Sequence, residues 1–140
     1  MAKLMRIMKK ILVVDDNISM RYLLENILKK SYNIRTADDG LTAMMMLSQG
    51  FTPDLILTDI NMPSINGWEL IAYLKKSILY KHIPIMVLSS TNLEDLSEET
   101  TTSLVYGCIK KPFEPIDLLQ RVSGVLKSSS FLSAVSINNN

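Results

Sequence analysis

Short apolar runs rich in β-branched residues alternate along this chain with segments whose apolar residues recur at helical spacing. The first run, "KILVVDD", ends in carboxylates, as is typical of a strand that is buried on both faces. Between residues 20 and 28 the apolar side chains lie three or four positions apart, and Asn17 or Ser19 precedes them as a candidate helix cap. The pattern predicts a strand followed by a helix.

The alternation continues to give five such units. "NIRTA" predicts a second strand, "GLTAMMMLSQG" a short helix ending at Gly50, and "DLILTD" a third strand. A helical stripe at 70–74 precedes the strand "IPIMVLSS", and after a polar stretch "LVYGCI" predicts a fifth strand before a last helix striped from 118 to 126. Parallel strands need crossovers, which are right-handed, so we expect an α/β fold with a parallel sheet covered on both faces.

The length of 140 residues predicts one compact domain. A content of 47% hydrophobic and 21% charged residues is typical of a globular chain rather than a disordered one. We place the domain at residues 9–127, after an N-terminal extension of residues 1–8 and before a C-terminal tail of residues 128–140. The tail is rich in Ser and Asn but also carries apolar residues, so its structure stays open.

Composition argues against several classes of partner. The net charge of +1 gives no general electrostatic reason to expect nucleic acid or an anionic membrane. The single Cys108 and single His82 can form neither an internal disulfide nor a Cys/His metal site. The run "ILVV" is shorter than the ~7 apolar residues of a signal peptide, and no segment approaches the ~18 of a membrane span. We expect a protein of the cytoplasm.

Polar residues stand where the predicted strands end. Asp15 and Asp16 follow the first strand, Asp59 ends the third, Ser89 ends the fourth, and Lys111 follows the fifth beside Lys110. In a parallel α/β sheet the binding crevice lies beyond the carboxyl ends of the strands. We therefore expect three carboxylates, a hydroxyl and an amine to meet at one rim.

Each of these residues also has an ordinary structural explanation. Asp15 or Asp16 is a favoured helix cap, Asp59 can open a turn before a proline, and an exposed lysine is usually only solvated. Those explanations do not account for like charges gathered at one edge, where each raises the pKa of the others. A Mg²⁺ ion bound between the carboxylates removes that conflict, and Asp59 can then act as a nucleophile toward phosphorus.

The motifs "LVVDDNISMR" (12–21), "LILTDINMPSINGWELI" (55–71), "IPIMVLSS" (83–90) and "IKKPF" (109–113) give the chain its family resemblance. Residues 9 to 127 resemble the receiver (CheY-like) domains of bacterial two-component response regulators. The resemblance implies the flavodoxin-like fold, a doubly wound (βα)5 parallel sheet with strand order 2-1-3-4-5. It also implies a phosphoacceptor that assists its own phosphorylation and dephosphorylation, rather than an enzyme that turns over substrate.

The resemblance assigns a role to each site residue. Asp59 is the expected phosphoacceptor, and it holds Mg²⁺ together with Asp16 and the main-chain carbonyl of Asn61. Asp15 is expected to hold the metal through water. The two remaining site residues are Ser89, at the family's Thr/Ser switch position, and Lys111, which contacts the phosphoryl group and precedes a proline through a bond that can be cis.

The implied partners are a sensor histidine kinase or a histidine phosphotransferase as phosphoryl donor and a downstream protein target. Signalling would then proceed by phosphorylation-dependent protein–protein interaction, with no direct contact to nucleic acid or membrane. No output domain fits after residue 127, so we expect either a stand-alone receiver or a receiver cut from a larger regulator or hybrid kinase.

The chain departs from the family at its fifth strand. Cys108 stands where the family usually carries an aromatic residue that turns inward on phosphorylation. Tyr106 lies two residues earlier, so a strand would place it on the same face. We expect a signal relay, if one exists, to pass through Tyr106 or through the Thr-rich segment 100–102.

Two functions from other classes remain open on the residues alone, together with a protein-interaction module that is never phosphorylated. A phosphatase of the haloacid dehalogenase type also uses an acid after a buried strand, but it needs a second acid where this chain has Asn61. A flavodoxin shares the sheet, but it needs a Ser/Thr-rich phosphate loop where this chain has "DDNIS".

Overall fold

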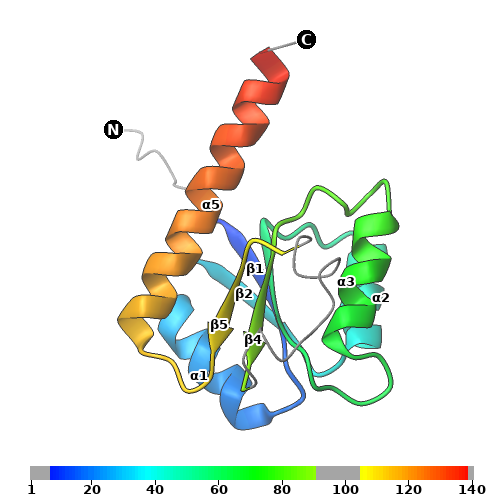
Figure 1. The fold of residues 1–140 in the computed structure, drawn as a ribbon, viewed down its shortest axis with the longest axis vertical. Helices are drawn as coiled ribbons and strands as arrows, with labels where there is room; N and C mark the ends of the chain where they lie inside the picture. The colour runs from blue at the N-terminus through cyan, green and yellow to red at the C-terminus, as the bar shows by residue number, and fades with distance from the viewer. Residues whose placement is uncertain (1–6, 91–104, 139–140) are drawn as a thin grey trace.

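The computed structural model describes residues 7–90 and 105–138, with side chains up to residue 128. Strands and helices alternate along these residues, as the sequence predicts, and Figure 1 shows them arranged around one central sheet. In chain order the elements are β1 (Lys10–Val14), α1 (Ile18–Leu28), β2 (Asn33–Ala37), α2 (Gly40–Ser48), β3 (Leu55–Asp59), α3 (Gly67–Lys76), β4 (Ile85–Ser89), β5 (Gly107–Lys110) and α5 (Pro115–Asn138).

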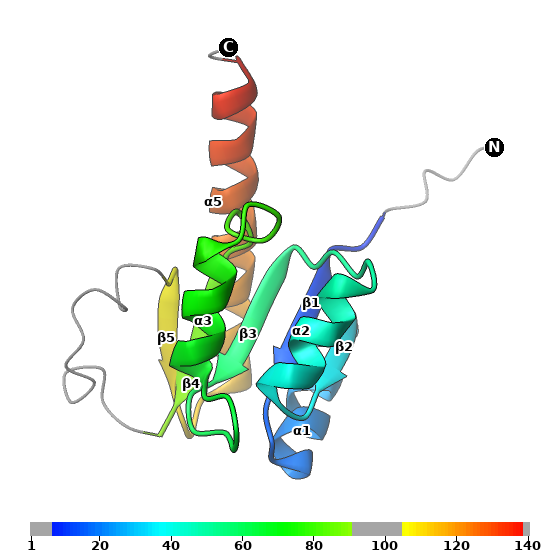
Figure 2. The ribbon, with the colours of Figure 1, turned by 90° about the vertical axis from the view of Figure 1, so that its right-hand side faces the viewer.

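The five strands form one parallel sheet in the order β2-β1-β3-β4-β5. Figure 2 shows α2 and α3 on the opposite side of the sheet from α1 and α5. This is the predicted doubly wound, flavodoxin-like α/β fold with strand order 2-1-3-4-5. The crossover between β4 and β5 falls largely on residues 91–104, which lie outside the described part of the chain.

The core consists of two apolar layers, one on each face of the sheet. Along β1, Ile11 and Val13 pack toward α1 and α5, whereas Leu12 and Val14 pack toward α2 and α3. Successive side chains of a strand point to opposite faces, so a strand between two helical layers must be apolar throughout. That requirement explains why "ILVV" and "LIL" show no alternation of polar and apolar residues.

Three helices begin with side-chain caps. The Asn17 side chain accepts a hydrogen bond from the Met20 N–H at 2.9 Å, and Asp39 caps α2 through the Thr42 N–H at 2.7 Å. Asn66 caps α3 and forms a capping box with Glu69. Of the two candidate caps, Asn17 and Ser19, the helix uses Asn17. Asp15 and Asp16, which precede Asn17, do not cap α1.

The last helix is longer than expected. α5 runs to Asn138, through the boundary placed at residue 127, and its ribbon projects beyond the end of the sheet in Figures 1 and 2. Residues 128–138 contain neither Pro nor Gly, the residues that most often stop a helix. No described helix is long and apolar enough to cross a lipid bilayer.

Two other predicted boundaries move slightly. The fifth strand covers Gly107–Lys110 rather than 104–109, because Val105 and Tyr106 lie in a bend. α2 ends at Ser48, and Gly50 follows with a positive φ of 102°, a backbone conformation that glycine adopts most readily.

Gly124 offers a direct test of the helical structure of α5. It is exposed in the middle of the helix, and a Cβ added there would meet nothing within 4 Å. Because glycine loses more conformational freedom than alanine on entering a helix, Gly124→Ala should raise the free energy of unfolding by about 0.5–1 kcal/mol. Urea unfolding followed by circular dichroism measures this, and a loss of stability would show that α5 is not helical at this position.

Candidate functional site

Three carboxylates meet at the carboxyl edge of the sheet. Asp15 and Asp16 follow β1, Asp59 ends the neighbouring β3, and one oxygen of each lies within 4.8 Å of the others. Asp15 is fully buried, Asp59 is buried, and Asp16 is exposed. They line an open cleft of about 430 Å³ together with Asn17, Ser19, Met20, Leu23 and Lys111.

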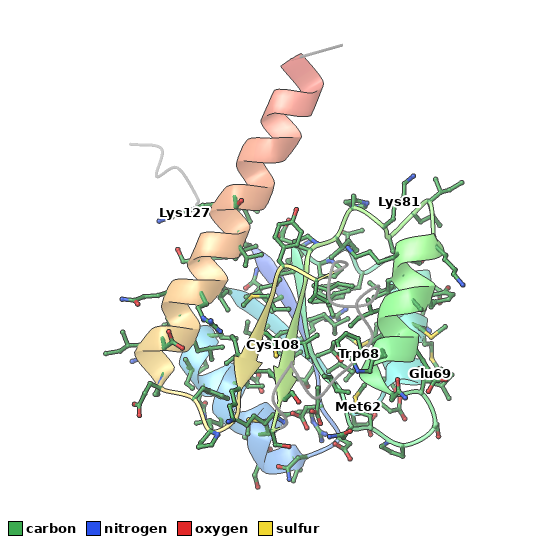
Figure 3. All side chains as sticks on the ribbon, viewed as in Figure 1. Met62, Trp68, Glu69, Lys81, Cys108 and Lys127 are labelled. Carbon is green, nitrogen blue, oxygen red and sulfur yellow. The ribbon has the colours of Figure 1, made fainter. Side chains whose placement is uncertain are left out.

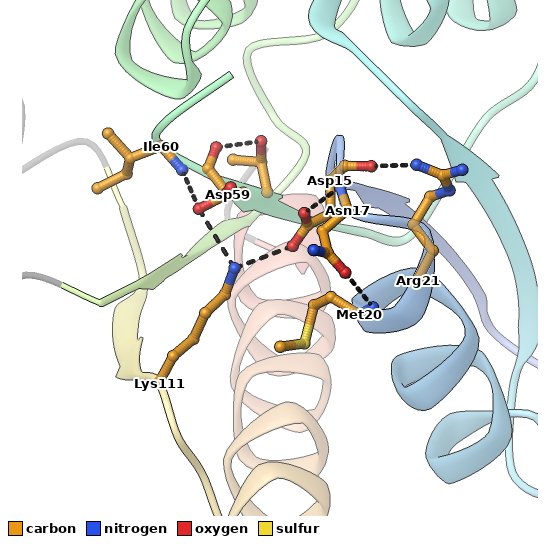
Figure 4. Close-up of polar contacts among 8 residues, drawn as sticks. Asp15, Asn17, Met20, Arg21, Asp59, Ile60 and Lys111 are labelled. Carbon is orange, nitrogen blue, oxygen red and sulfur yellow. Dashed lines mark hydrogen bonds and ion pairs between the residues drawn. The ribbon is translucent and has the colours of Figure 1, made fainter. Parts of the chain in front are cut away.

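Lys111 reaches this cluster from the far edge of the sheet. Its Nζ lies 3.0 Å from Asp15 Oδ2 and 3.4 Å from Asp59 Oδ1, and Figure 4 shows it bridging the two carboxylates. Lys110 is exposed, so the structure places Lys111 and not its neighbour in the site. The Lys111–Pro112 peptide bond is cis, as the family resemblance allowed.

Asp15 is held on three sides. Its Oδ1 accepts a hydrogen bond from the Asn17 N–H at 2.9 Å, and its Oδ2 accepts from Lys111. Its carbonyl oxygen accepts from Nη1 of Arg21 at 2.7 Å, also drawn in Figure 4. The sequence did not predict this role for Arg21, because the position of an arginine on a helix does not show which backbone atom its side chain contacts.

Asp59 is less constrained. Its Oδ1 accepts the Ile60 N–H at 2.8 Å. Burial raises the pKa of Asp59 above its ordinary value, and the Asp15 charge raises it further, while Lys111 and the Ile60 N–H act in the opposite direction. One lysine thus faces three carboxylates, and the excess of negative oxygen ligands fits a hard divalent cation such as Mg²⁺.

The loop after β3 folds back onto Asp59. The Gly67 N–H donates to the Ile60 carbonyl at 2.8 Å, and a Cβ at Gly67 would lie 2.3 Å from the Asp59 carbonyl oxygen. No other residue fits without moving the backbone of Asp59. The sequence signal was present in "NGWEL", where the cap Asn66 precedes the glycine, but we did not assign it to the site.

Ser89 and Asn61 lie close to the site in the chain but do not line the cleft. Ser89 ends β4 in a buried position, and its carbonyl accepts the Lys111 N–H at 2.8 Å. Asn61 is exposed, two residues beyond Asp59. Their roles as switch hydroxyl and metal-binding carbonyl stay predictions.

The structure describes only part of the predicted signal relay, namely Tyr106 and Cys108. Cys108 packs with the core layer beside α2 and α3, whereas Tyr106 precedes β5 and borders a cleft with Arg121 and Val125 of α5. The two residues therefore border different layers rather than one shared face. Residues 100–102 lie outside the described part of the chain, so the relay stays a prediction. Figure 3 places Cys108 on the edge strand, away from Met62 in the loop after Asp59.

Comparison with known proteins settles the family. The model of the response regulator receiver domain matches residues 11–123. The chain belongs to the response regulator receiver family. The chemotaxis protein CheY-3 of Vibrio cholerae is 33% identical over 120 residues, which cover 84% of this chain and 92% of that protein.

The chain is also similar to a solved response regulator and to part of a sensor histidine kinase. The response regulator TrrA of Thermotoga maritima, solved in complex with Mg²⁺-BeF, superimposes with a TM-score of 0.74 at 30% identity over 84% of this chain and 98% of that one. The sensor histidine kinase TmoS of Ectopseudomonas mendocina is 33% identical over 117 residues. These residues cover 84% of this chain but only 12% of the length of that kinase.

The receiver assignment gives the acidic cluster its purpose. Asp15, Asp16 and Asp59 form the site of a receiver domain for phosphoryl acceptance, and the domain is a phosphoacceptor signalling module rather than a turnover enzyme. The phosphatase and flavodoxin alternatives are therefore set aside.

The raised pKa of Asp59 makes a prediction about stability in the absence of metal. The folded state binds this proton more tightly than the unfolded state, so ionisation of Asp59 costs stability once the pH exceeds the folded pKa. Asp59→Asn should therefore be more stable than the wild type at pH 7, and the difference should shrink as the pH falls toward 3.8, the ordinary value.

Thermal unfolding without Mg²⁺ at pH 7 and pH 4 measures this difference, with the exposed Asp38→Asn as the control. A difference between wild type and Asp59→Asn that does not change with pH would contradict the burial argument.

Proposed function

We propose that Asp59 accepts a phosphoryl group from a phosphohistidine of a sensor histidine kinase or histidine phosphotransferase, and that the phosphorylated domain signals by binding another protein. One observation carries the proposal. Asp59 is buried with a raised pKa, lies within 4.8 Å of two further carboxylates, and has the Lys111 amine 3.4 Å away. A carboxylate in that setting is poised as a nucleophile rather than as a surface ion pair.

The transfer is a displacement at phosphorus. An Asp59 oxygen forms the new bond, the bond from phosphorus to the imidazole nitrogen breaks, and that nitrogen keeps the electron pair and takes a proton from solvent. Asp59 Oδ1 is held by the Ile60 N–H, while Oδ2 accepts no hydrogen bond from the described residues and is the free nucleophile. Lys111 lies where it can stabilise the negative charge on the phosphoryl oxygens.

Mg²⁺ is the proposed cofactor, and it would neutralise charge on the transferring phosphoryl oxygens. Asp16 and Asp59 would hold it with the Asn61 carbonyl, and Asp15 would hold it through water. The exposed Asp16 carboxylate has no hydrogen bond or ion pair within the described residues, so it is available to a cation. The Mg²⁺-BeF complex of TrrA supports this choice of metal.

A docking surface for the phosphoryl donor borders the cleft. Ile18, Tyr22 and Leu23 on α1 are exposed by 59%, 62% and 45%. Leu23 lines the acidic cleft, and Ile18 and Tyr22 line a smaller cleft on the same helix. Apolar residues gathered on one exposed surface often mark a site of protein–protein interaction. We assign this surface to the donor, we propose that the protein acts in the cytoplasm beside the kinase, and we assign the switch to Ser89.

Asp59 should be the only acceptor. Incubation with acetyl phosphate and Mg²⁺ should add one phosphate, about 80 Da by the chemistry of the transfer, to the wild type and none to Asp59→Asn. Intact-mass spectrometry measures the addition. Asp38→Asn, which leaves the cluster untouched, should be labelled like the wild type. Equal labelling of Asp59→Asn would overturn the assignment.

Docking can be separated from chemistry by changing Tyr22. Tyr22→Ala removes exposed apolar surface without touching the carboxylates, so phosphorylation by acetyl phosphate should be unchanged. Transfer from a phosphorylated histidine kinase that labels the wild type should slow about fivefold or more, the loss expected for an interface residue worth 1 kcal/mol. Tyr73→Ala, an exposed tyrosine on α3, serves as the control. Equal slowing by both variants would argue against a docking surface on α1.

A further inference from the structure

We infer that Arg21 is a positioning residue for the metal site, acting through the backbone of Asp15. The inference rests on the proposed function, because it concerns how the carboxylates are held ready for Mg²⁺. Arg21 lies on the first turns of α1, and its guanidinium Nη1 donates to the Asp15 carbonyl at 2.7 Å.

The bond fixes the peptide that carries Asp16. The Asp15 carbonyl belongs to the peptide unit between Asp15 and Asp16, so its orientation sets the direction in which Asp16 leaves the chain. The Asp16 side chain is exposed and has no partner within the described residues. Its placement within 4.8 Å of the other two carboxylates therefore depends on the backbone. The Asp15 carboxylate holds that backbone at the Asn17 N–H, and Arg21 holds it at the Asp15 carbonyl.

Arg21 also differs from Lys111 in what it leaves free. Lys111 binds carboxylate oxygens of Asp15 and Asp59, and so competes with a cation for them. Arg21 binds a carbonyl and brings a permanent positive charge near the cluster without occupying a carboxylate oxygen. Arg21 thus fixes the backbone at Asp15 and itself takes up no carboxylate oxygen of the cluster that a cation could bind.

Arg21 connects the site to the surface assigned to the donor. It lines a small cleft with Ile18, Tyr22, Glu25 and Thr36, and Ile18 and Tyr22 belong to that surface. A partner that packs on α1 therefore touches the residues beside the arginine that holds Asp15. Arg21 therefore contacts the backbone that orients the metal ligands and also borders the surface assigned to the donor.

The test compares Mg²⁺ affinity in two arginine variants by isothermal titration calorimetry. Arg21→Met keeps the length of the side chain but removes the hydrogen bond, and loss of an outer partner of a metal ligand typically weakens metal binding by about 10- to 100-fold. Arg121→Met is the matched control, since Arg121 also donates from Nη1 to a main-chain carbonyl, that of Cys108 at 2.6 Å, and does not line the acidic cleft; its exposed ion pair with Asp117 at 4.0 Å is lost as well. Both variants should lose some thermal stability, but only Arg21→Met should lose Mg²⁺ affinity.

Arg21→Lys, which keeps the charge and one donor, should recover part of the affinity, and amide hydrogen exchange at Asp16 and Asn17 in the metal-free protein should be faster in Arg21→Met. Unchanged Mg²⁺ affinity in Arg21→Met, beside a wild type that binds Mg²⁺ and is phosphorylated, would overturn this inference alone. A wild type that neither binds Mg²⁺ nor accepts phosphate would instead overturn the proposed function.

Discussion

The ion pair of Lys111 with Asp15 and Asp59 is the interaction on which the acidic site depends. It joins residues 96 positions apart in the chain, from the end of β1 and the end of β5. Buried carboxylates are costly unless they are paired, and two of them lie side by side here. The lysine offsets part of that cost, which allows the strands to end in charge at the point where the parallel sheet opens to solvent.

The single positive charge of Lys111 does not balance the three carboxylates, and the unbalanced negative charge makes the site suited to a cation. Asp15 is fully bonded and fixed, Asp16 is free and exposed, and Asp59 keeps one oxygen without a partner among the described residues. Residual repulsion and burial raise the pKa of Asp59, so its ionised form gains most when a further cation arrives. The three carboxylates therefore fit a metal site in which one lysine leaves negative charge unbalanced.

Much of this could be read from the sequence because buried parallel strands have a simple pattern. The strands followed from the apolar runs and the helical stripes, whereas their order in the sheet followed from the family resemblance. Asp15, Asp16, Asp59 and Lys111 followed from where the apolar runs end. Asn17 as a cap followed from local chemistry. These features depend on residue type and on position along one element.

Other features depend on contacts between elements, and they were not predicted. The Arg21 bond to Asp15 and the close approach of Gly67 to Asp59 require the distance between a helix and a strand end, which no periodicity gives. The length of α5 depends on the absence of a stop signal in a polar segment, and the placement of Tyr106 depends on where β5 begins. Sequence patterns predict whether a segment is a helix or a strand more reliably than they predict the residues at which it begins and ends.

The central claim, that the Lys111 amine and the proposed metal ion compete for the negative charge of the same carboxylates, is tested most directly by titrating Mg²⁺ into Lys111→Met by calorimetry. In the proposed site Mg²⁺ would bind Asp59, whose Oδ1 lies 3.4 Å from the Lys111 amine, and Asp15, which pairs with the same amine at 3.0 Å, would hold the metal through water. Removal of the competing amine should therefore tighten Mg²⁺ binding, even though the variant loses the group proposed to stabilise the phosphoryl oxygens. Mg²⁺ affinity equal to or weaker than that of the wild type, in a variant that remains folded, would contradict the account.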